Sequence, residues 1–315
     1  MIILGVESTA HTFGVGIVTD KGRVLANAFD RYTSKDAGMI LDLVAEHHKT
    51  VAEDVLKRAF VESGLKWSDI DLIAYSAGPG LDPVLWAGYH ISKRWAEENG
   101  KKLVGINHCA AHLSIGKVYN KAKDPCYIYV SGVNTQVIVY DGGKYRVMGE
   151  TLDIGLGNML DKLGRILDLG FPAGPKIEEL AKKGKYIELS YVVKGMDVSF
   201  SGIQTKAEQL FKKGICKEDL CFSLQETCFA MVAEVTERAM AHNDKKELIL
   251  IGGVGANKRF CEMLEIMCKE RGAKFYNVPI SLAGDQGAMI AWEGFLRREE
   301  SGDIEINPHW RVDEV

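Results

Sequence analysis

The chain has 315 residues, 46% of them hydrophobic, which is enough material for two cores of ordinary size. Its 39 basic and 43 acidic residues give a net charge of −4, so a nucleic-acid substrate would need a local basic patch or a helper subunit. Seven cysteines, an odd number without a Cys-x-x-Cys pair, favour a reduced intracellular chain. No apolar run approaches the length of a membrane span, and we expect a cytoplasmic protein.

The first half alternates strand-like and helix-like segments, which indicates an α/β fold. Apolar residues recur at helical spacing over residues 40–63, and we expect a structural role for at least one of His47 and His48 there. The predicted strands of this half are residues 2–9, 13–19, 23–26, 71–76 and 102–106.

The second half repeats the pattern of strand, polar turn, strand, turn and strand. A helical stripe over 219–242 and an apolar run at 247–251 follow it. The repetition predicts two related lobes, which we divide at residues 1–125 and 126–315, with the last helix packing back on the first lobe. The repeated strands are residues 127–135, 136–140 and 145–148.

Two histidines stand four residues apart directly after the strand-like run 102–106. His108 and His112 would project from one face of a helix, where their nitrogens can bind one metal ion. On spacing alone, a pair of surface histidines is an equal alternative. Asp285 lies in a small-residue loop before a predicted helix at 288–296, where it can cap that helix or act as a further metal ligand.

Four turns after strands offer backbone N–H groups to phosphate: residues 8–9, 131–135, 172–175 and 251–257. The last is the strongest, because an apolar strand enters Gly252-Gly253 and a helix opens near Asn257. Nucleotide binding is favoured there over a bare turn. No Walker or Gly-x-Gly-x-x-Gly pattern occurs, which argues against a P-loop or Rossmann site. Asp161 and Glu178 could accept from ribose hydroxyls or an amine, although solvation is the default for isolated carboxylates.

Taken together, the motifs resemble the tRNA threonylcarbamoyladenosine transferase family, which includes bacterial TsaD and the catalytic subunit of KEOPS. The residues of these motifs are most similar to those of the archaeal and eukaryotic branch. The resemblance implies two duplicated ribonuclease-H-like lobes of the actin, Hsp70 and sugar-kinase superfold with a cleft between them. The matching segments are residues 107–112, 129–136, 149–155, 193–202, 223–227, 252–257 and 285–291.

The resemblance also implies two binding sites. One divalent metal, iron or zinc, would be held by His108, His112, Tyr129 and Asp285, a ligand set suited to either metal. The adenylate would be threonylcarbamoyl-AMP, with ATP or AMP as alternatives. Its implied contacts are Tyr129, Val130, Ser131, Gly132, Val133, Asp161, Gly174, Glu178 and Asn257.

The implied reaction transfers a threonylcarbamoyl group from threonylcarbamoyl-AMP to the adenosine next to the anticodon of ANN-decoding tRNA. The resemblance assigns no residue as the general base. The implied partners are tRNA, a small kinase-like ATPase on the C-terminal lobe and a small dimerising subunit on the N-terminal helices, including residues 40–63.

Four positions depart from the family pattern: Trp86, Val133, Ala173 and Gln286. At Val133 a β-branched residue replaces a glycine, which adds bulk near the phosphate and resists a positive φ. These departures leave open a catalytically weak or silent member that acts as a scaffold in a KEOPS-like complex. A small-molecule kinase of the same superfold is a further alternative, but it gives the two histidines no role.

Overall fold

The computed structural model describes residues 1–33, 40–300 and 305–315. They form two compact units. The first comprises Met1–Tyr119 together with Gly284–Val315, and the second comprises Asn120–Ala283. The chain therefore leaves the first unit once and returns to it at its C-terminal end. Among the described residues, no helix is both long and apolar enough to cross a membrane.

The first unit is built on a five-stranded sheet in the order β3-β2-β1-β4-β5. Strands β1, β2 and β3 form an antiparallel meander, and β4 and β5 extend it in parallel with β1. Its elements are β1 (Ile2–Glu7), β2 (Thr12–Thr19), β3 (Val24–Arg31), α1 (Leu41–Ser63), β4 (Leu72–Gly78), α2 (Asp82–Asn99), β5 (Lys102–Asn107), α3 (His108–Asn120) and α10 (Gly287–Leu296), with short 3-10 turns at Trp67–Asp69 and Val312–Glu314.

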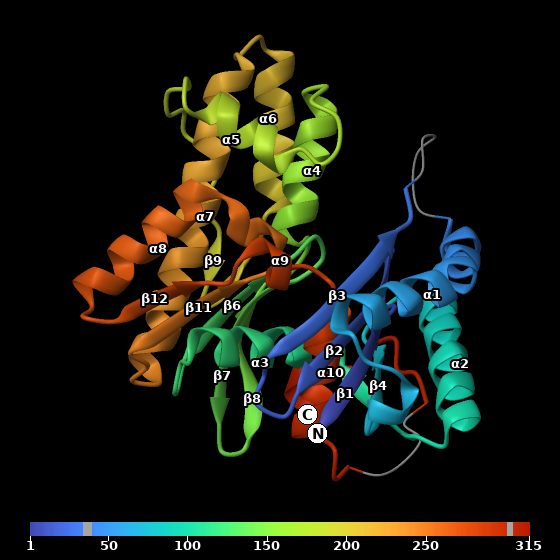
Figure 1. Cartoon of the computed structure of the whole chain (residues 1–315). Coiled ribbons are helices and arrows are strands. Elements are labelled where there is room, and N and C mark those ends of the chain that lie inside the picture. Colours follow the sequence, from blue (N-terminus) through green and yellow to red (C-terminus); the bar gives the residue numbers. More distant parts are fainter. Residues whose placement is uncertain (34–39, 301–304) are drawn as a thin grey trace. The chain divides into compact units, whose positions relative to one another are not determined.

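Helices cover this sheet on both faces because successive side chains of a strand point to opposite sides. Leu4 and Val6 pack in one core with residues of α1 and α2. Gly5, between them, faces α10, and a Cβ added there would lie 2.2 Å from the backbone nitrogen of Ala291. Gly16 on β2 is equally tight against Ala288. The absent side chains allow α10 to lie directly on the sheet (Figure 1).

The second unit has a five-stranded sheet in the order β12-β11-β6-β7-β8, with β6, β7 and β8 as an antiparallel meander and β11 and β12 parallel to β6. Strands β9 and β10 pair with each other in a separate two-stranded sheet. Its elements are β6 (Cys126–Val130), β7 (Thr135–Asp141), β8 (Lys144–Glu150), α4 (Leu156–Ile166), α5 (Gly174–Ala181), β9 (Val193–Lys194), β10 (Asp197–Val198), α6 (Ser201–Lys212), α7 (Lys217–His242), β11 (Glu247–Ile251), η2 (Gly253–Ala256), α8 (Lys258–Glu270), β12 (Lys274–Asn277) and α9 (Ile280–Ala283).

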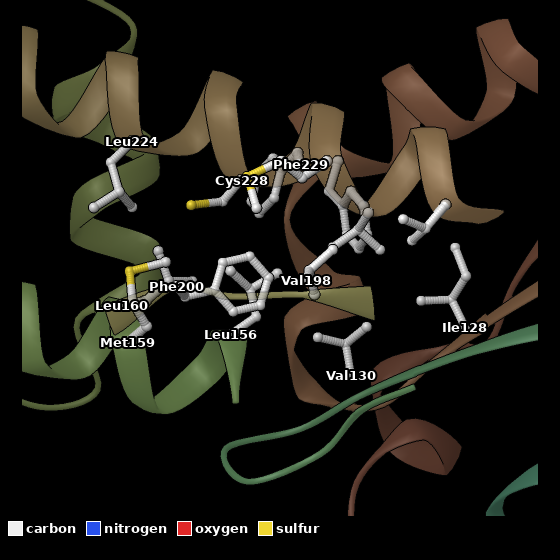
Figure 2. Close-up of a cluster of buried hydrophobic side chains, with 14 of the residues drawn as sticks. Ile128, Val130, Leu156, Met159, Leu160, Val198, Phe200, Leu224, Cys228 and Phe229 are labelled. Atoms are coloured by element: carbon white, nitrogen blue, oxygen red, sulfur yellow. The ribbon is translucent and has the colours of Figure 1, made fainter. Parts of the chain in front are cut away.

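The core of the second unit joins β6, α4 and α7. Figure 2 shows the side chains of these elements meeting around Phe200. The labelled residues come from β6 (Ile128, Val130), α4 (Leu156, Met159, Leu160), β10 and the residues after it (Val198, Phe200), and α7 (Leu224, Cys228, Phe229). This core packs the end of β6 against the start of α4.

Both units have the same topology, a meander extended by two parallel strands on the first-strand side, which confirms the predicted duplication and α/β class. The helical stripes at 40–63 and 219–242 correspond to α1 and α7. Strand β3 is longer than the segment 23–26 that the sequence predicts. It continues to Arg31 and pairs with β2 to its end, although the polar residues Asn27 and Asp30 interrupt its apolar pattern. Backbone pairing, rather than side-chain pattern, sets its length.

Candidate functional site

The candidate site of the first unit lies at the junction of β5 and α3. Strands β1, β4 and β5 are parallel, so their carboxyl ends share one edge of the sheet, where α/β proteins commonly bind ligands. Asn107 ends β5, and its Oδ1 accepts a hydrogen bond from the N–H of Ala110 at 3.0 Å. This is the contact that an N-cap residue makes, so Asn107 starts α3 immediately before His108.

Three ligand atoms converge beside this junction. The rings of His108 and His112 lie 4.7 Å apart between centroids on the same face of α3, as the spacing predicts. Oδ1 of Asp285 is 3.3 Å from Nε2 of His112 and 3.6 Å from Nε2 of His108. Donor atoms about 2.1 Å from a tetrahedral metal ion lie roughly 3.4 Å from one another. The spacing of these side chains therefore fits a zinc-like or iron-like ion.

Asp285 is available for this role because a neighbour caps the following helix. Oε1 of Gln286 accepts from the N–H of Met289 at 3.1 Å and caps α10. The sequence left open that Asp285 itself was the cap. Its carboxylate instead faces the two histidines, and these three residues are the only His, Cys, Asp or Glu group among the described residues whose ligand atoms gather closely enough for one ion.

Glu7, at the end of β1, contacts Nδ1 of His108, the ring nitrogen opposite the one near Asp285. The sequence analysis did not single out this residue. The carboxylate is completely buried, and Oε2 lies 3.0 Å from Nδ1 of His108. Oε1 accepts from the backbone N–H of Thr9 at 2.8 Å and also from its hydroxyl. A carboxylate that holds Nδ1–H directs Nε2 toward a metal. The available signal was an acidic residue at the end of an otherwise apolar strand.

The same contacts change the interpretation of the turn after β1. The sequence offered Ser8-Thr9 as a phosphate-binding turn. The N–H of Ser8 donates to Oγ of Ser76 at 2.9 Å, and the N–H of Thr9 donates to Glu7. Both amides are therefore used inside the protein, and this turn supports the histidine site rather than a phosphate.

The ionisable groups of the histidine site strongly influence one another. Burial opposes protonation of His108, but Glu7 and then Asp285 outweigh it and raise the pKa of His108 to about 9. Burial lowers the pKa of His112 despite its hydrogen bond to Asp285. Burial would raise the pKa of Asp285, but the two histidines hold that pKa well below its usual range. Burial also raises the pKa of Cys109 to about 12, so its thiol stays protonated and is not a thiolate ligand.

A separate candidate site lies in the second unit, at the end of β6. Residues 131–134 form a tight turn in which the N–H of Asn134 donates to Oγ of Ser131 at 3.0 Å. The carbonyls of Ser131 and Gly132 accept from the N–H groups of Gly157 and Asn158 in the first turn of α4. These hydrogen bonds hold the turn against the N-terminus of α4.

The loop after β11 lies beside this turn. Gly252 has φ +104°, and a Cβ there would approach the carbonyl oxygen of Val130 to 2.2 Å. Asn257 caps α8 by accepting from the N–H of Phe260 at 3.1 Å, as predicted for the helix start. Its Nδ2 donates to Oε1 of Gln225 at 2.9 Å. Only glycine therefore fits at position 252, where the loop after β11 passes the end of β6.

Two other expected adenylate contacts, Asp161 and Glu178, accept backbone hydrogen bonds at the starts of α5 and α8. Oδ1 of Asp161, on α4, accepts from the N–H of Ala173 at 2.8 Å, next to Gly174 at the start of α5. Oε1 of Glu178, on α5, accepts from the N–H of Lys258 at 3.0 Å, so Glu178 and Asn257 meet at the start of α8. Tyr129 lies on β6 in the second unit, whereas the histidine site lies in the first.

Comparison with known proteins identifies the family. A sequence model of TsaD, described as tRNA N6-adenosine threonylcarbamoyltransferase, matches residues 23–292. The chain belongs to this family. It is 50% identical to the tRNA N6-adenosine threonylcarbamoyltransferase of Thermococcus kodakarensis over 100% of this chain and 98% of the relative. It is 46% identical to a probable bifunctional tRNA threonylcarbamoyladenosine biosynthesis protein of Methanobrevibacter smithii, covering 100% of this chain and 60% of that protein.

Solved structures place this TsaD-family chain in the expected superfold. A nucleotide- and phosphate-bound HypF has a TM-score of 0.63 at 11% identity, over 96% of this chain and 56% of that one. A ROK hexokinase from Thermus thermophilus has a TM-score of 0.51 at 17% identity, over 96% and 100%. At such low identity the similarity concerns the fold alone, and it confirms the predicted actin-like and sugar-kinase-like architecture.

Three departures from the TsaD pattern have local structural explanations. The side chain of Val133 is 71% exposed, and its φ is not positive, so the expected backbone strain is absent there. The methyl group of Ala173 fills space beside Gly164, where a Cβ would lie 2.0 Å from it. Trp86, on α2, stacks on His90 with ring centroids 5.4 Å apart.

Proposed function

We propose that the chain is a metal-dependent tRNA N6-adenosine threonylcarbamoyltransferase. The reaction would move a threonylcarbamoyl group from threonylcarbamoyl-AMP to the adenosine beside the anticodon of ANN-decoding tRNA. Full-length similarity to proteins named for this activity supports the reaction class. The convergence of His108, His112 and Asp285, whose ligand atoms all lie within 4.8 Å of one another, is the observation that carries the metal requirement.

In this proposal His108, His112 and Asp285 hold one iron or zinc ion, and Tyr129 completes the set. When bound, the ion supplies Lewis-acid polarisation of a carbamoyl or phosphate oxygen. Glu7 holds the Nδ1 proton of His108 and so keeps Nε2 available as a ligand. Because Gln286 caps α10, the carboxylate of Asp285 is not needed as the helix cap and can bind the ion.

The adenylate would bind in the second unit. In the 131–135 turn, the backbone N–H groups of Gly132 and Val133 would face the phosphate, since those of Ser131 and Asn134 donate within the turn, which is itself held by the first turn of α4. Asp161 and Glu178 each use one carboxylate oxygen on a backbone N–H, and the other oxygen can accept from a ribose hydroxyl or the threonyl end. Asn257, Gly174 and the Gly252 loop would hold the nucleoside.

The proposed partners are tRNA, a kinase-like ATPase on the second unit and a small dimerising subunit on the N-terminal helices. A groove of about 640 Å³ beside α1 favours the last of these, since it is lined by Leu56, Phe60, Val61 and Trp67. Val61 is 77% exposed, a cost that a covering subunit would remove. The net charge of −4 also argues for help in holding tRNA.

The decisive experiment is single-turnover transfer from threonylcarbamoyl-AMP to tRNA by the purified chain with its partners, together with elemental analysis. Asp285→Asn should lose bound metal and transfer activity. His242→Ala, an exposed histidine at the end of α7, is the matched control and should change neither. Transfer without any bound metal would refute the metal requirement, and nucleotide binding without transfer to tRNA would leave the scaffold alternative.

A further inference from the structure

The C-terminal segment, residues 305–315, is bound at the carboxyl ends of β4 and β5. The N–H of Asn307 donates to the carbonyl of Ala77 at 2.7 Å, and the N–H of Gly80 donates to the carbonyl of Pro308 at 3.2 Å. Ile306 and Trp310 pack against the core of the first unit. The segment is therefore fixed by both backbone hydrogen bonds and apolar contacts at the edge that carries the histidine site.

A glycine makes this close approach possible. Gly78, the last residue of β4, has φ +148°, and a Cβ there would lie 1.9 Å from the carbonyl oxygen of Asn307. No other residue fits this position with the segment in place. The sequence around β4 is thus specialised to receive the C-terminal segment.

Asn107 connects the segment to the helix that carries the histidines. Its Nδ2 donates to the carbonyls of Trp310 at 3.2 Å and Arg311 at 3.4 Å. Its Oδ1 caps α3 through the N–H of Ala110. The side chain is completely buried, so each half of the amide depends on its protein partners. One side chain therefore ties the last residues of the chain to the backbone beside His108.

We propose that residues 305–315 act through Asn107 as a positioning element for His108 and for the metal site. With the segment in place, Asn107 can satisfy donor and acceptor together only in the orientation that caps α3. Without it, the buried Nδ2 has lost its acceptors, and the side chain must turn or take up water, which loosens the first turn of α3. This inference rests on the proposed metal site for its function, but its structural step can be measured without metal.

The test uses the full chain, Asn107→Ser, deletion of residues 305–315 and the two changes combined. Serine retains an oxygen that can cap α3 but lacks the amide donor. Hydrogen exchange of the metal-free proteins reports the first turn of α3. Titration with Co²⁺, followed by visible absorption, reports affinity and ligand geometry. Asn99→Ser, which removes an amide contact to the carbonyl of Trp95 at the end of α2, is the matched control.

We expect faster exchange at residues 108–112 and a roughly 10-fold loss of Co²⁺ affinity in each single change. The combined protein should lose little more than either alone, because both remove the same link. Asn107→Ala should lose more, because the cap disappears as well. Unchanged exchange at 108–112, or losses that simply add, would overturn the inference. If the wild-type chain binds no Co²⁺ while the exchange changes are coupled, the metal proposal fails and the link through Asn107 stands.

Discussion

Replacing Glu7 by glutamine tests whether the buried carboxylate prepares His108 for metal binding. Glutamine has the same size, but it replaces one acceptor oxygen by an NH₂ donor. Glu7 now accepts on both sides, from Nδ1 of His108 at 3.0 Å and from the N–H of Thr9 at 2.8 Å. Whichever way the amide of glutamine is turned, one side faces the wrong group.

Both orientations have a predictable cost. If the NH₂ group faces His108, Nδ1 must become the acceptor, and the proton moves to Nε2, where it blocks the metal. If the NH₂ group faces Thr9, two donors oppose each other in a buried place, which costs about 1–3 kcal/mol. Changes behind a metal ligand typically lower affinity by about 10–100-fold, or roughly 1.4–2.7 kcal/mol, and we expect Glu7→Gln to fall in this range.

The assay is competition between a chelator and the metal-free protein for Zn²⁺ or Co²⁺, with thermal unfolding as the check on folding. Glu293→Gln is the control, since Glu293 is also buried in the first unit but pairs with Arg297 at 2.7 Å, away from the histidines. It should lose stability without losing metal affinity. Wild-type affinity in Glu7→Gln would refute the reasoning that Glu7 selects the ligand atom of His108.

Four further predictions concern single sites and partners. His112→Ala should lose at least 10–100-fold in metal affinity, and unchanged metal content after dialysis would contradict its role as a ligand. Val133→Gly should tighten AMP binding by about 1 kcal/mol, roughly fivefold, because it removes an exposed side chain from the phosphate turn, and calorimetry showing equal or weaker binding would disprove this. Burial, aided by the charge of His47, lowers the pKa of His48 to about 4 from 6.5, so the unfolded chain binds this proton first and stability falls as the pH drops from about 6.5 to 4. Denaturant titrations across that range should show a loss of stability of roughly 3 kcal/mol that is absent in His48→Leu, and an unaltered pH dependence in that variant would exclude His48 as its source. Filter binding at fixed salt should give the isolated chain a tRNA Kd of only about 10⁻⁴–10⁻⁶ M if duplex-DNA values transfer, with partners strengthening it, whereas tight specific binding by the lone chain would refute the argument from charge.

Local patterns in the sequence predicted most of the secondary structure, the duplication of the fold and part of the candidate site. Hydrophobic periodicity located α1, α7 and most strands, and the repeated meander predicted two related units. The spacing of His108 and His112 placed both rings on one helical face, and the polar start of α8 identified Asn257 as a helix opener. Each of these features depends on residues close together in the chain, where spacing and propensity act directly.

Tertiary structure decided the contacts that make the histidines a candidate site. Spacing could not show that Asp285 faces His112 across 173 residues, nor that Glu7 holds His108 across 101. The link from Asn107 to Arg311 spans 204 residues. Contacts of this length depend on the strand order β3-β2-β1-β4-β5 and on the return of α10 and the C-terminal segment to that sheet. No local pattern encodes them, because the residues become neighbours only when the whole first unit has formed.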